Sequence, residues 1–428
     1  MGAVRLIDRR AFLRAASSGA VALGAGGLSL EVAARTLRQR ATAPSDEIVV
    51  GVIGPGSRGK YMMRQMLRVP GVRIGAVCDI YAPRFAEANE VVGHAVPAFA
   101  DYRRMLEETN DLDAVLVATP LGLHVDHVVA SLDSGCHVYG EKAMGFTVAD
   151  CNAITAAVER SGRRFQVGQQ YRYAPWYRQA VRRIREGEIG AVTHIYAYWH
   201  RNYNWRRPVP DPSLERLINW RLYRENSGGL LAELGSHHLD IANWILGEMP
   251  ERVIGNGGIN FYRDGRETFD NVQAIYTYPS GAKFMFSSLI GNQRTGFQIV
   301  VYGTGGTVEL TLEDGHFFYE PARDNSAVPE EMLAAGARTS ASLSTSGDMP
   351  YRGPGALIEV PEEEVGDPSL LAAASFFESL RDNVRPFADE RVGWETAVSI
   401  ALGNIAAYAG DRVDFADHVA ASLTRETG

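Results

Sequence analysis

The 428-residue sequence has little cysteine, no long apolar run and no excess of positive charge. Its three cysteines, Cys78, Cys136 and Cys151, form an odd and scattered set that indicates neither a disulfide framework nor a zinc site. No apolar stretch reaches the roughly 20 residues that a membrane-spanning helix needs. The net charge of −8 argues against nucleic acid, because phosphate binding requires clustered lysine and arginine. We therefore expect no metal, no nucleic-acid partner and no stable membrane insertion.

The rest of the composition is that of a soluble globular protein. The hydrophobic fraction is 46% and the charged fraction is 22%. The length is sufficient for two ordinary domains.

The N-terminal segment has the layout of a twin-arginine export signal. Residues 8–14 read D-R-R-A-F-L-R, an uncharged Ala/Gly-rich run follows at 15–30, and small residues stand at 32–34. The alternative is an ordinary amphipathic helix, but the absence of charge from 15–30 favours the signal. We expect residues 1–46 to be signal and linker, and the protein to be exported to the periplasm. Twin-arginine substrates cross the membrane folded, so a bound cofactor can travel with them.

Strand and helix patterns alternate over the next 120 residues or so, a length on the order of one domain. Apolar runs typical of buried parallel strands lie at 47–53, 72–78, 112–118 and 137–140. Helical patterns lie at 60–68, 83–92, 123–134 and 148–160. This alternation predicts an α/β domain at 47–165 with a doubly wound parallel sheet, the Rossmann type.

A glycine-rich turn joins the first strand to the first helix. In G-x-G-x-x-G, Gly54 permits the tight turn, Gly56 lets the backbone approach a pyrophosphate, and Gly59 lets the helix pack closely. Asp79 ends the second strand, where its carboxylate would bind the adenosine ribose and repel the extra phosphate of NADP. The alternative is a turn that binds nothing, with Asp79 capping a strand. Three agreeing features favour an NAD site.

Four segments carry a resemblance to a known family. They read V-G-V-I-G-P-G-S-R-G at 50–59, A-T-P-L-G-L-H at 118–124, G-E-K-A at 140–143 and E-L-G-S-H-H-L-D at 233–240. In this order they resemble the glucose–fructose oxidoreductase, inositol dehydrogenase and rhizopine-catabolism (Gfo/Idh/MocA) oxidoreductases, from about residue 47 to 412. The resemblance implies a Rossmann domain followed, over 166–428, by an α+β domain with an open, mostly antiparallel sheet. It also implies a dimer or tetramer.

The patterns after residue 166 suit that second domain. A helix is predicted at 175–185, and short strands at 192–199, 252–260, 272–278, 282–290, 297–302 and 307–312. Residues 321–367 are rich in Ser, Pro, Ala and Gly and indicate a surface excursion. A final helix, 392–409, is expected to pack back toward the first domain.

Lys142 is the first candidate catalytic residue. It stands at the carboxyl end of a parallel strand, where ligands of doubly wound folds bind. The resemblance gives this lysine a proton-relay role, and burial would lower its pKa. The alternative is a surface lysine paired with Glu141. The family usually has proline next, whereas this chain has Ala143.

Glu233 and His237 are the other catalytic candidates. They are four residues apart in a helical run at 230–246, a spacing that places them on one face. The resemblance places a carboxylate and a histidine there, beside the nicotinamide. His237 would be the general base, and Glu233 would orient it or bind a neighbouring hydroxyl. Relatives often have aspartate at this position, so the longer Glu233 indicates a changed substrate pose. The alternative is a structural histidine, the role we expect for His238.

Two further sets of binding residues are predicted. The expected cofactor contacts are Gly54, Gly56, Ser57, Arg58, Gly59, Asp79, Thr119, Pro120, His124 and Glu141, although His124 could equally cap its helix. The expected substrate contacts are Arg172, Tyr173, Tyr203, Asn204, Trp205, Trp220 and Asp240, because aromatic rings and amides suit sugars. Residues 201–224 look like an insert over the cleft. The alternative for each aromatic residue is ordinary packing.

The sequence thus predicts an NAD-dependent oxidoreductase that acts on a secondary hydroxyl of a sugar or sugar derivative. Export favours tightly held NAD in a closed redox cycle, because no free cofactor pool is expected outside the cytoplasm. An alternative is an NAD-dependent glycoside hydrolase that works by transient oxidation, elimination, hydration and re-reduction. The turn at 57–59 resembles that class, whereas 228–240 resembles the dehydrogenases. A third reading is a non-catalytic sugar sensor, which the retention of Lys142 and His237 disfavours.

Overall fold

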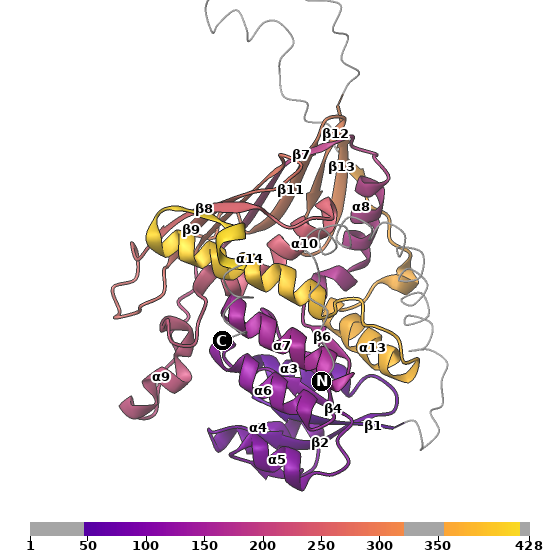
Figure 1. The fold of residues 1–428 in the computed structure, drawn as a ribbon, viewed down its shortest axis with the longest axis vertical. Helices are drawn as coiled ribbons and strands as arrows, with labels where there is room; N and C mark the ends of the chain where they lie inside the picture. Colours follow the sequence, from indigo (N-terminus) through magenta and orange to yellow (C-terminus); the bar gives the residue numbers. More distant parts are fainter. Residues whose placement is uncertain (1–46, 321–354, 420–428) are drawn as a thin grey trace, which may run out of the picture.

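A computed structural model describes residues 47–320 and 355–419, which form two sheets with helices packed around them (Figure 1). The predicted signal and linker, and the part of the predicted excursion at 321–354, lie outside the described residues. Within the described ranges, no helix is both long and apolar enough to cross a membrane.

The first sheet has six parallel strands in the order β3-β2-β1-β4-β5-β6. The strands are β1 (Ile48–Ile53), β2 (Val72–Cys78), β3 (Ala98–Phe99), β4 (Ala114–Val117), β5 (His137–Gly140) and β6 (Phe165–Val167). The associated helices are α3 (Ser57–Met66), α4 (Pro83–Val92), α5 (Tyr102–Glu108), the short 3-10 turn η3 (Leu121–Leu123), α6 (His124–Asp133) and α7 (Val148–Ser161). Every residue of β1 is buried, as a parallel strand between two helical layers requires.

The second sheet has nine strands in the order β14-β13-β12-β11-β7-β10-β9-β8-β15. They are β7 (Val192–His200), β8 (Arg252–Gly258), β9 (Asn271–Thr277), β10 (Lys283–Leu289), β11 (Phe297–Gly303), β12 (Gly306–Leu310), β13 (Gly315–Tyr319), β14 (Ala356–Leu357) and β15 (Arg412–Asp414). Neighbours are antiparallel, except that β7 and β10 are parallel. The predicted fold class is therefore confirmed.

The remaining helices lie in the second half of the chain. They are η4 (Gln170–Tyr173), α8 (Pro175–Arg185), η5 (Pro212–Leu214), α9 (Glu215–Ile218), η6 (Trp220–Leu222), the π-helical turn η7 (Leu231–Gly235), α10 (Ser236–Leu246), η8 (Glu362–Glu364), α13 (Pro368–Arg381) and α14 (Glu390–Ala409). The sequence analysis did not predict α13 or the short elements β3, α5, β6, β13, β14 and β15.

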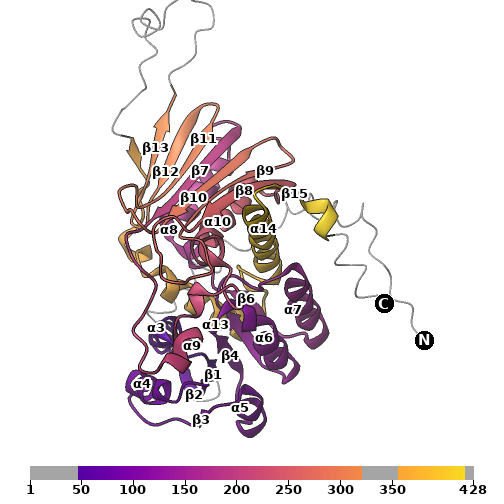
Figure 2. The same ribbon diagram turned by 90° about the vertical axis from the view of Figure 1, so that its left-hand side faces the viewer.

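Helix α14 lies between the second sheet and α7, in contact with both (Figure 2). Two glycines permit this close approach. A Cβ on Gly403 would lie 2.0 Å from the hydroxyl of Tyr276, and one on Gly255 would lie 2.9 Å from the backbone nitrogen of Ala407. Asp389 caps the helix by accepting hydrogen bonds from the backbone of residues 391 and 392. This helix therefore contacts both halves of the molecule.

Helix α13 packs against α3 of the first domain and against η4. Its side chains Leu370, Phe376 and Phe377 belong to the same buried cluster as Ile48 and Val50 of β1. A segment assigned from sequence to the second domain thus completes the core of the first.

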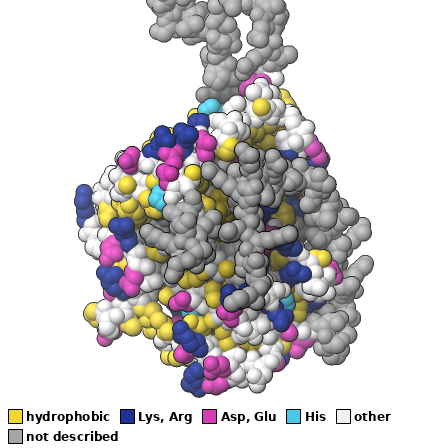
Figure 3. All heavy atoms as spheres, in the orientation of Figure 1, with side chains coloured by type: hydrophobic (Ala, Val, Ile, Leu, Met, Phe, Trp, Pro, Cys, Tyr) yellow, Lys and Arg dark blue, Asp and Glu magenta, His cyan; other side chains and the backbone are white. Residues whose placement is uncertain are grey.

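Charged side chains of both signs are interspersed over the face shown in Figure 3. Elsewhere in the described chain, charged residues form exposed pairs, as Arg73 does with Glu47 and Asp111. Exposed pairs of this kind contribute little to stability.

Candidate functional site

A cleft opens at the ends of β1, β2 and β4, where the strand order of the first sheet reverses. Its empty volume is about 1050 Å³. Seven of the predicted cofactor-binding residues line it: Gly54, Gly56, Ser57, Arg58, Asp79, Thr119 and Pro120. The opposite wall comes from the second domain, through Arg207, Leu217, Ile218, Trp220 and Arg221. The predicted insert at 201–224 therefore covers the cofactor end of the cleft.

The glycine turn fits a dinucleotide pyrophosphate. Gly54 has φ +88°, and a Cβ there would lie 2.9 Å from the backbone of Ala118. A Cβ on Gly59 would lie 2.2 Å from the carbonyl oxygen of Gly54, which explains the close packing of α3. A Cβ on Gly56 would meet nothing within 4 Å, because this residue faces the open cleft. Helix α3 has no capping side chain and no acidic residue in its first turn, so its N–H groups are available to phosphate.

The adenosine end of the cleft is formed around Asp79. Its Oδ1 accepts a hydrogen bond of 2.8 Å from the backbone of Tyr81, and burial raises the pKa of the carboxyl. Ile80 lies beside it in the cleft wall with 70% of its surface exposed. A carboxylate next to an apolar surface suits a ribose attached to a flat base.

His127 is a cleft residue that the sequence analysis missed. Its Nδ1 lies 3.1 Å from the hydroxyl of Thr119, and its ring lies edge-on to Tyr102, with centroids 4.5 Å apart. Burial lowers the pKa of His127 to about 4, so the ring is neutral. The ring that packs against it, Tyr102, belongs to α5, which was not predicted.

His124 does not match either of its predicted roles. Its Nδ1 lies 2.9 Å from the carbonyl oxygen of Ala143, and its Nε2 lies 3.0 Å from that of Thr119. No side-chain hydrogen bond caps α6, whose N-cap is Leu123. With both nitrogens facing the backbone, the ring ties Ala143 to Thr119, just after β4, instead of pointing into the cleft.

Glu141 and Arg58 form a pair beneath the glycine turn. The Nε of Arg58 donates to Oε1 of Glu141 at 2.8 Å, and Nη1 lies 3.4 Å from the hydroxyl of Ser369 on α13. The Nη2 atom is buried with no partner among the described residues. Arg58 lines the cleft, whereas Glu141 is buried behind it against Gly168. Glu141 therefore positions Arg58 and does not reach the cofactor.

Lys142 lies two residues after the end of β5, and its side chain reaches the backbone of the second domain. Its Nζ donates to the carbonyl oxygen of Glu233 at 2.8 Å and lies 3.4 Å from that of Ala232. Burial lowers its pKa, and the carboxylates of Glu233 and Glu141 offset this only in part. The Lys142–Ala143 peptide bond is cis. This is a half-buried lysine held by two backbone carbonyl groups, not the surface lysine of the alternative interpretation.

The sequence predicts one continuous helix for Glu233 and His237, but the structure divides it into two elements. Glu233 belongs to the π-helical turn η7, which leads into α10 at residue 236. Its carboxylate accepts from Nε of Arg221 at 2.8 Å. Burial alone would raise the pKa of Glu233, but the charges of Arg221 and Lys142 outweigh it and lower the pKa. Glu233 is thus an ion-pair partner of Arg221, and the prediction that it orients His237 is wrong.

His237 is buried beside two aromatic rings. Tyr171 lies 4.6 Å from it and Trp199 lies 5.9 Å from it, measured between centroids. Its Nδ1 is buried with no partner among the described residues. Burial, together with the charge of Lys142, lowers its pKa well below the usual value. His237 is therefore a neutral imidazole, able to accept a proton from a ligand.

The neighbouring His238 packs on Phe286 and Phe297, and its Nδ1 lies 3.2 Å from the carbonyl oxygen of Leu234. This is the structural role that we expect for it.

Three predicted substrate residues are part of the scaffold. The Nε of Arg172 donates to both carboxylate oxygens of Asp240, at 2.9 and 2.8 Å, and this pair is buried. Thr396 of α14 donates to the same carboxylate. Tyr173 is buried and accepts a hydrogen bond from the backbone of Ala388 through its hydroxyl. None of the three can contact a sugar, because their polar groups are satisfied inside the protein.

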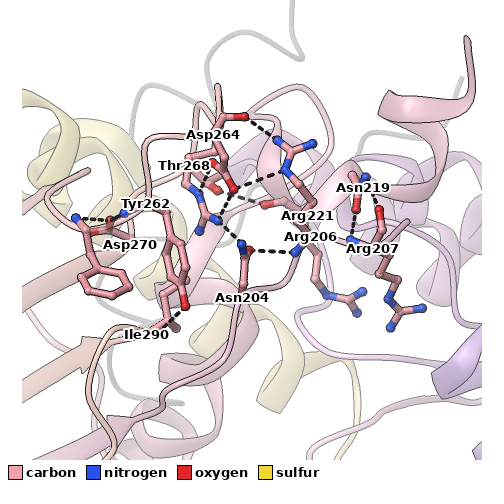
Figure 4. A network of polar contacts seen from close by, with 12 residues as sticks. Asn204, Arg206, Arg207, Asn219, Arg221, Tyr262, Asp264, Thr268, Asp270 and Ile290 are labelled. Carbon is pink, nitrogen blue, oxygen red and sulfur yellow. Dashed lines mark hydrogen bonds and ion pairs between the residues drawn. The ribbon is translucent and has the colours of Figure 1, made fainter. Parts of the chain in front are cut away.

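The other predicted substrate residues lie on the insert, and of these Trp220 lines the cleft. Tyr203 is exposed, and Trp205 packs against the main core. The Oδ1 of Asn204 accepts from Arg266 at 2.7 Å and from the backbone of residue 206, so Asn204 holds the base of the insert (Figure 4). Sequence reasoning missed Tyr171, Trp199, Arg207 and Arg221, although each is adjacent to a residue or segment that it named.

Potential metal ligands do not cluster in the part of the chain that the structure describes. Over residues 47–320 and 355–419, no three His, Cys, Asp or Glu side chains are grouped so that they could hold an ion.

Comparison with known proteins gives the same two-part division. The family described as "Oxidoreductase family, NAD-binding Rossmann fold" matches residues 48–169, and the "GFO/IDH/MocA C-terminal domain" matches residues 177–309. An uncharacterized oxidoreductase of Bacillus subtilis, YrbE, is 27% identical over 72% of this chain and 89% of its own length. The 2,7-anhydro-N-acetylneuraminate hydratase of Mediterraneibacter gnavus is 27% identical over 64% of this chain and 72% of its own.

Solved structures share the fold at low sequence identity. The aldose-aldose oxidoreductase from Caulobacter crescentus, complexed with glycerol, is 21% identical with a TM-score of 0.67. A levoglucosan dehydrogenase in complex with NADH is 17% identical with a TM-score of 0.69. Each comparison covers 86% of this chain and 99% of the other.

Proposed function

Because this chain belongs to the GFO/IDH/MocA family of NAD-dependent oxidoreductases, we propose that it oxidises a secondary hydroxyl of a sugar or sugar derivative. We further propose that it keeps its NAD bound between turnovers, in a closed redox cycle. The sugar-acting relatives and structural neighbours support the substrate class. The cofactor, NAD, is that of the family and fits the glycine turn and Asp79.

One observation carries the proposal: the two domains bring Lys142 and His237 together. Lys142 lies two residues beyond β5 of the first sheet, His237 is the second residue of α10 in the second domain, and the charge of the lysine lowers the pKa of the histidine. The backbone carbonyl of Glu233, four residues before His237, accepts a hydrogen bond from the lysine ammonium. An amine and a neutral imidazole in one place are the groups that an alcohol oxidation needs.

The roles of the residues follow from their protonation states. When bound, NAD supplies the acceptor for the hydride. His237, neutral at pH 7, accepts the hydroxyl proton as the carbon–oxygen bond becomes a carbonyl. An ammonium has three N–H donors, and carbonyl oxygens of the second domain occupy at most two of those of Lys142, so one is left for the substrate oxygen. The carboxylate of Glu233 keeps Arg221 neutralised beside them.

Retention of the cofactor is supported by the insert, which provides one wall of the cleft. It also suits the proposed export through a twin-arginine signal, whose residues lie outside the described ones. A protein that leaves the cytoplasm with bound NAD must regenerate it on the spot. A second sugar that is reduced in the same site would do so.

A second candidate function is glycoside cleavage through transient oxidation. A relative named as a hydratase of an anhydro sugar favours it, because addition of water is one step of that cycle. In this reading His237 and Lys142 would take and return the same proton, with no net redox change. Release of the alcohol from an aryl glycoside, without added NAD, distinguishes this function from the first.

The test is direct. The purified protein is mixed with a panel of sugars, sugar acids and aryl glycosides, then denatured, and the released nicotinamide cofactor is identified. Conversion of NAD to NADH by a free sugar supports oxidation, whereas a free aglycone with unchanged NAD supports the glycosidase. Protein that neither carries nor binds NAD would overturn both.

We also propose a homo-oligomer that forms through the outer face of the second sheet. Ile254 and Ile275 are 53% and 45% exposed on neighbouring strands of this sheet, and Tyr302 adds a third exposed apolar group. Exposed apolar residues on one face favour contact between copies. Sedimentation analysis that shows only monomer would contradict this.

A further inference from the structure

One wall of the cofactor cleft is built by the other domain. Residues 201–224 leave the end of β7 and descend to the level of the first sheet, where α9 projects from the molecule (Figure 1). There Nη1 of Arg207 donates to the hydroxyl of Ser57 at 3.1 Å. Ser57 is the first residue of α3, next to Gly56, so this arginine lies at the point where the pyrophosphate of a dinucleotide belongs.

Arg207 differs from the other arginines of the cleft because it has no carboxylate partner among the described residues. Four arginines line it, and three are paired with carboxylates: Arg58 with Glu141, Arg84 with Glu87, and Arg221 with Glu233. Within the described part of the chain, no carboxylate pairs with Arg207. A guanidinium that faces a cleft without a counter-ion is complementary to an anionic ligand.

The backbone of Arg207 is held in place by one buried side chain. Its N–H donates to Oδ1 of Asn219 at 2.6 Å, and its carbonyl oxygen accepts from Nδ2 of the same residue at 3.0 Å. Asn219 is 2% exposed and also donates to Glu215. Two opposed hydrogen bonds to one residue fix the direction in which the arginine side chain leaves the chain.

The insert is braced at its base by a second set of contacts (Figure 4). Arg206 bonds to Asp264 and Glu215, and Arg266 bonds to Asp264 at 2.7 Å. Arg266 holds the pKa of the Asp264 carboxyl far below its usual range, so this carboxylate stays charged. Asp270 accepts three backbone N–H groups at 260–262 and thereby orders the loop that carries Asp264. A wall that is ordered before the ligand arrives loses little entropy on binding.

We propose that Arg207 binds the pyrophosphate of NAD from the second domain, and that the braced insert thereby slows release of the cofactor. This rests on the proposed function, and it adds a phosphate ligand that lies outside the Rossmann domain. The two domains then hold the same dinucleotide, α3 through its N–H groups and the insert through a guanidinium.

The experiment compares Arg207→Ala with Arg216→Ala in the full-length protein. Arg216 lies on the same insert, but it points to Glu267 and does not line the cleft, so it is a matched control. Dissociation of NADH is followed by its fluorescence after mixing with excess NAD, and equilibrium binding is measured for NAD and for ADP-ribose. We expect Arg207→Ala to release NADH at least about tenfold faster, a change of about 1.4 kcal/mol, and Arg216→Ala to behave as the wild type.

ADP-ribose identifies the part of the dinucleotide that is bound. Equal loss of affinity for NAD and ADP-ribose supports contact with the pyrophosphate, whereas loss for NAD alone overturns it in favour of the nicotinamide. Unchanged release in Arg207→Ala overturns the proposal and leaves the proposed function standing. A wild-type protein that binds no dinucleotide overturns both. Asp264→Asn, which loosens the brace without touching the cleft, should also speed release if the insert retains the cofactor.

Discussion

The ammonium of Lys142 lies 2.8 Å from the backbone carbonyl oxygen of Glu233, and this contact joins the first domain to the second at the centre of the site. The position of the lysine therefore depends on how the two domains meet. Since Nζ is held by backbone and not by the Glu233 side chain, the side chain is free to pair with Arg221. The atom that we propose to act in catalysis is thus also a contact between the domains.

Replacement of Lys142 by methionine should leave NAD binding unchanged and lower kcat at least about a hundredfold, because general acid–base groups contribute roughly 10² or more. Titration with NAD measures the binding, and the rate of sugar oxidation measures kcat. Lys283→Met, at an exposed position on β10, serves as the control with full activity. Full turnover in Lys142→Met would contradict the assigned role.

The pH dependence of turnover should reflect His237. Its pKa is lowered by burial first and by Lys142 second, so the ring is neutral and active above that low pKa, and it loses activity only as acid protonates it. The ordinary pKa of histidine is roughly 6.5. We therefore expect the acidic limb of the kcat/KM profile to lie well below that pH. In Lys142→Met the positive neighbour is gone, so the pKa of His237 should rise. Titration of the His237 ring followed by NMR measures this pKa directly. An unchanged pKa in Lys142→Met would argue against the proximity of Lys142 and His237.

Asp240 should matter for stability, not for substrate binding. Asp240→Ala leaves the buried guanidinium of Arg172 without a partner and should lower the free energy of unfolding by about 3–5 kcal/mol. The matched control is Asp133→Ala, whose exposed pair with Arg160 contributes at most about 1 kcal/mol. Chemical denaturation measures both. A raised KM with unchanged stability in Asp240→Ala would restore the substrate-binding interpretation.

Asp79 should set the preference for NAD over NADP. Asp79→Asn removes the charge that repels a ribose phosphate and weakens the bonds to the ribose hydroxyls, so affinity for NAD should fall about tenfold while that for NADP rises. Titration of the purified variant with each dinucleotide checks this. Asp101→Asn, an N-cap residue of α5 that does not line the cleft, is the comparison. An unchanged ratio of the two affinities would mean that another group selects the cofactor.

Much of the first domain could be predicted from sequence because its signals are local. The fully apolar β1, the glycine turn and Asp79 occur within about thirty residues, roughly the span of one βαβ unit, and each acts through its own backbone position. The strands of the second sheet were also recognisable, since residues such as Val272, Ala274 and Tyr276 alternate with exposed ones along β9.

The substrate-binding predictions failed because they depended on contacts between distant residues. Arg172 and Asp240 look like free polar groups in sequence, yet they neutralise each other across 68 positions. Glu233 and His237 have helical spacing, but Glu233 lies in a π-helical turn and its carboxylate pairs with Arg221, a contact that the spacing alone could not show. The insert that carries Arg207 was predicted from sequence, but the choice of this one arginine depends on the path of the insert past Ser57.

The place of α13 has a consequence for how the protein is made. Leu370, Phe376 and Phe377 close the core against β1, although more than 300 residues separate them from it in a chain of 428. The ribosome must therefore release most of the polypeptide before the cofactor domain can finish folding. A fragment that stops after β6 would keep a contiguous parallel sheet and the whole glycine turn, yet it would expose the apolar surface that α13 covers. The NAD-binding half is continuous in its sheet but is not an autonomous module.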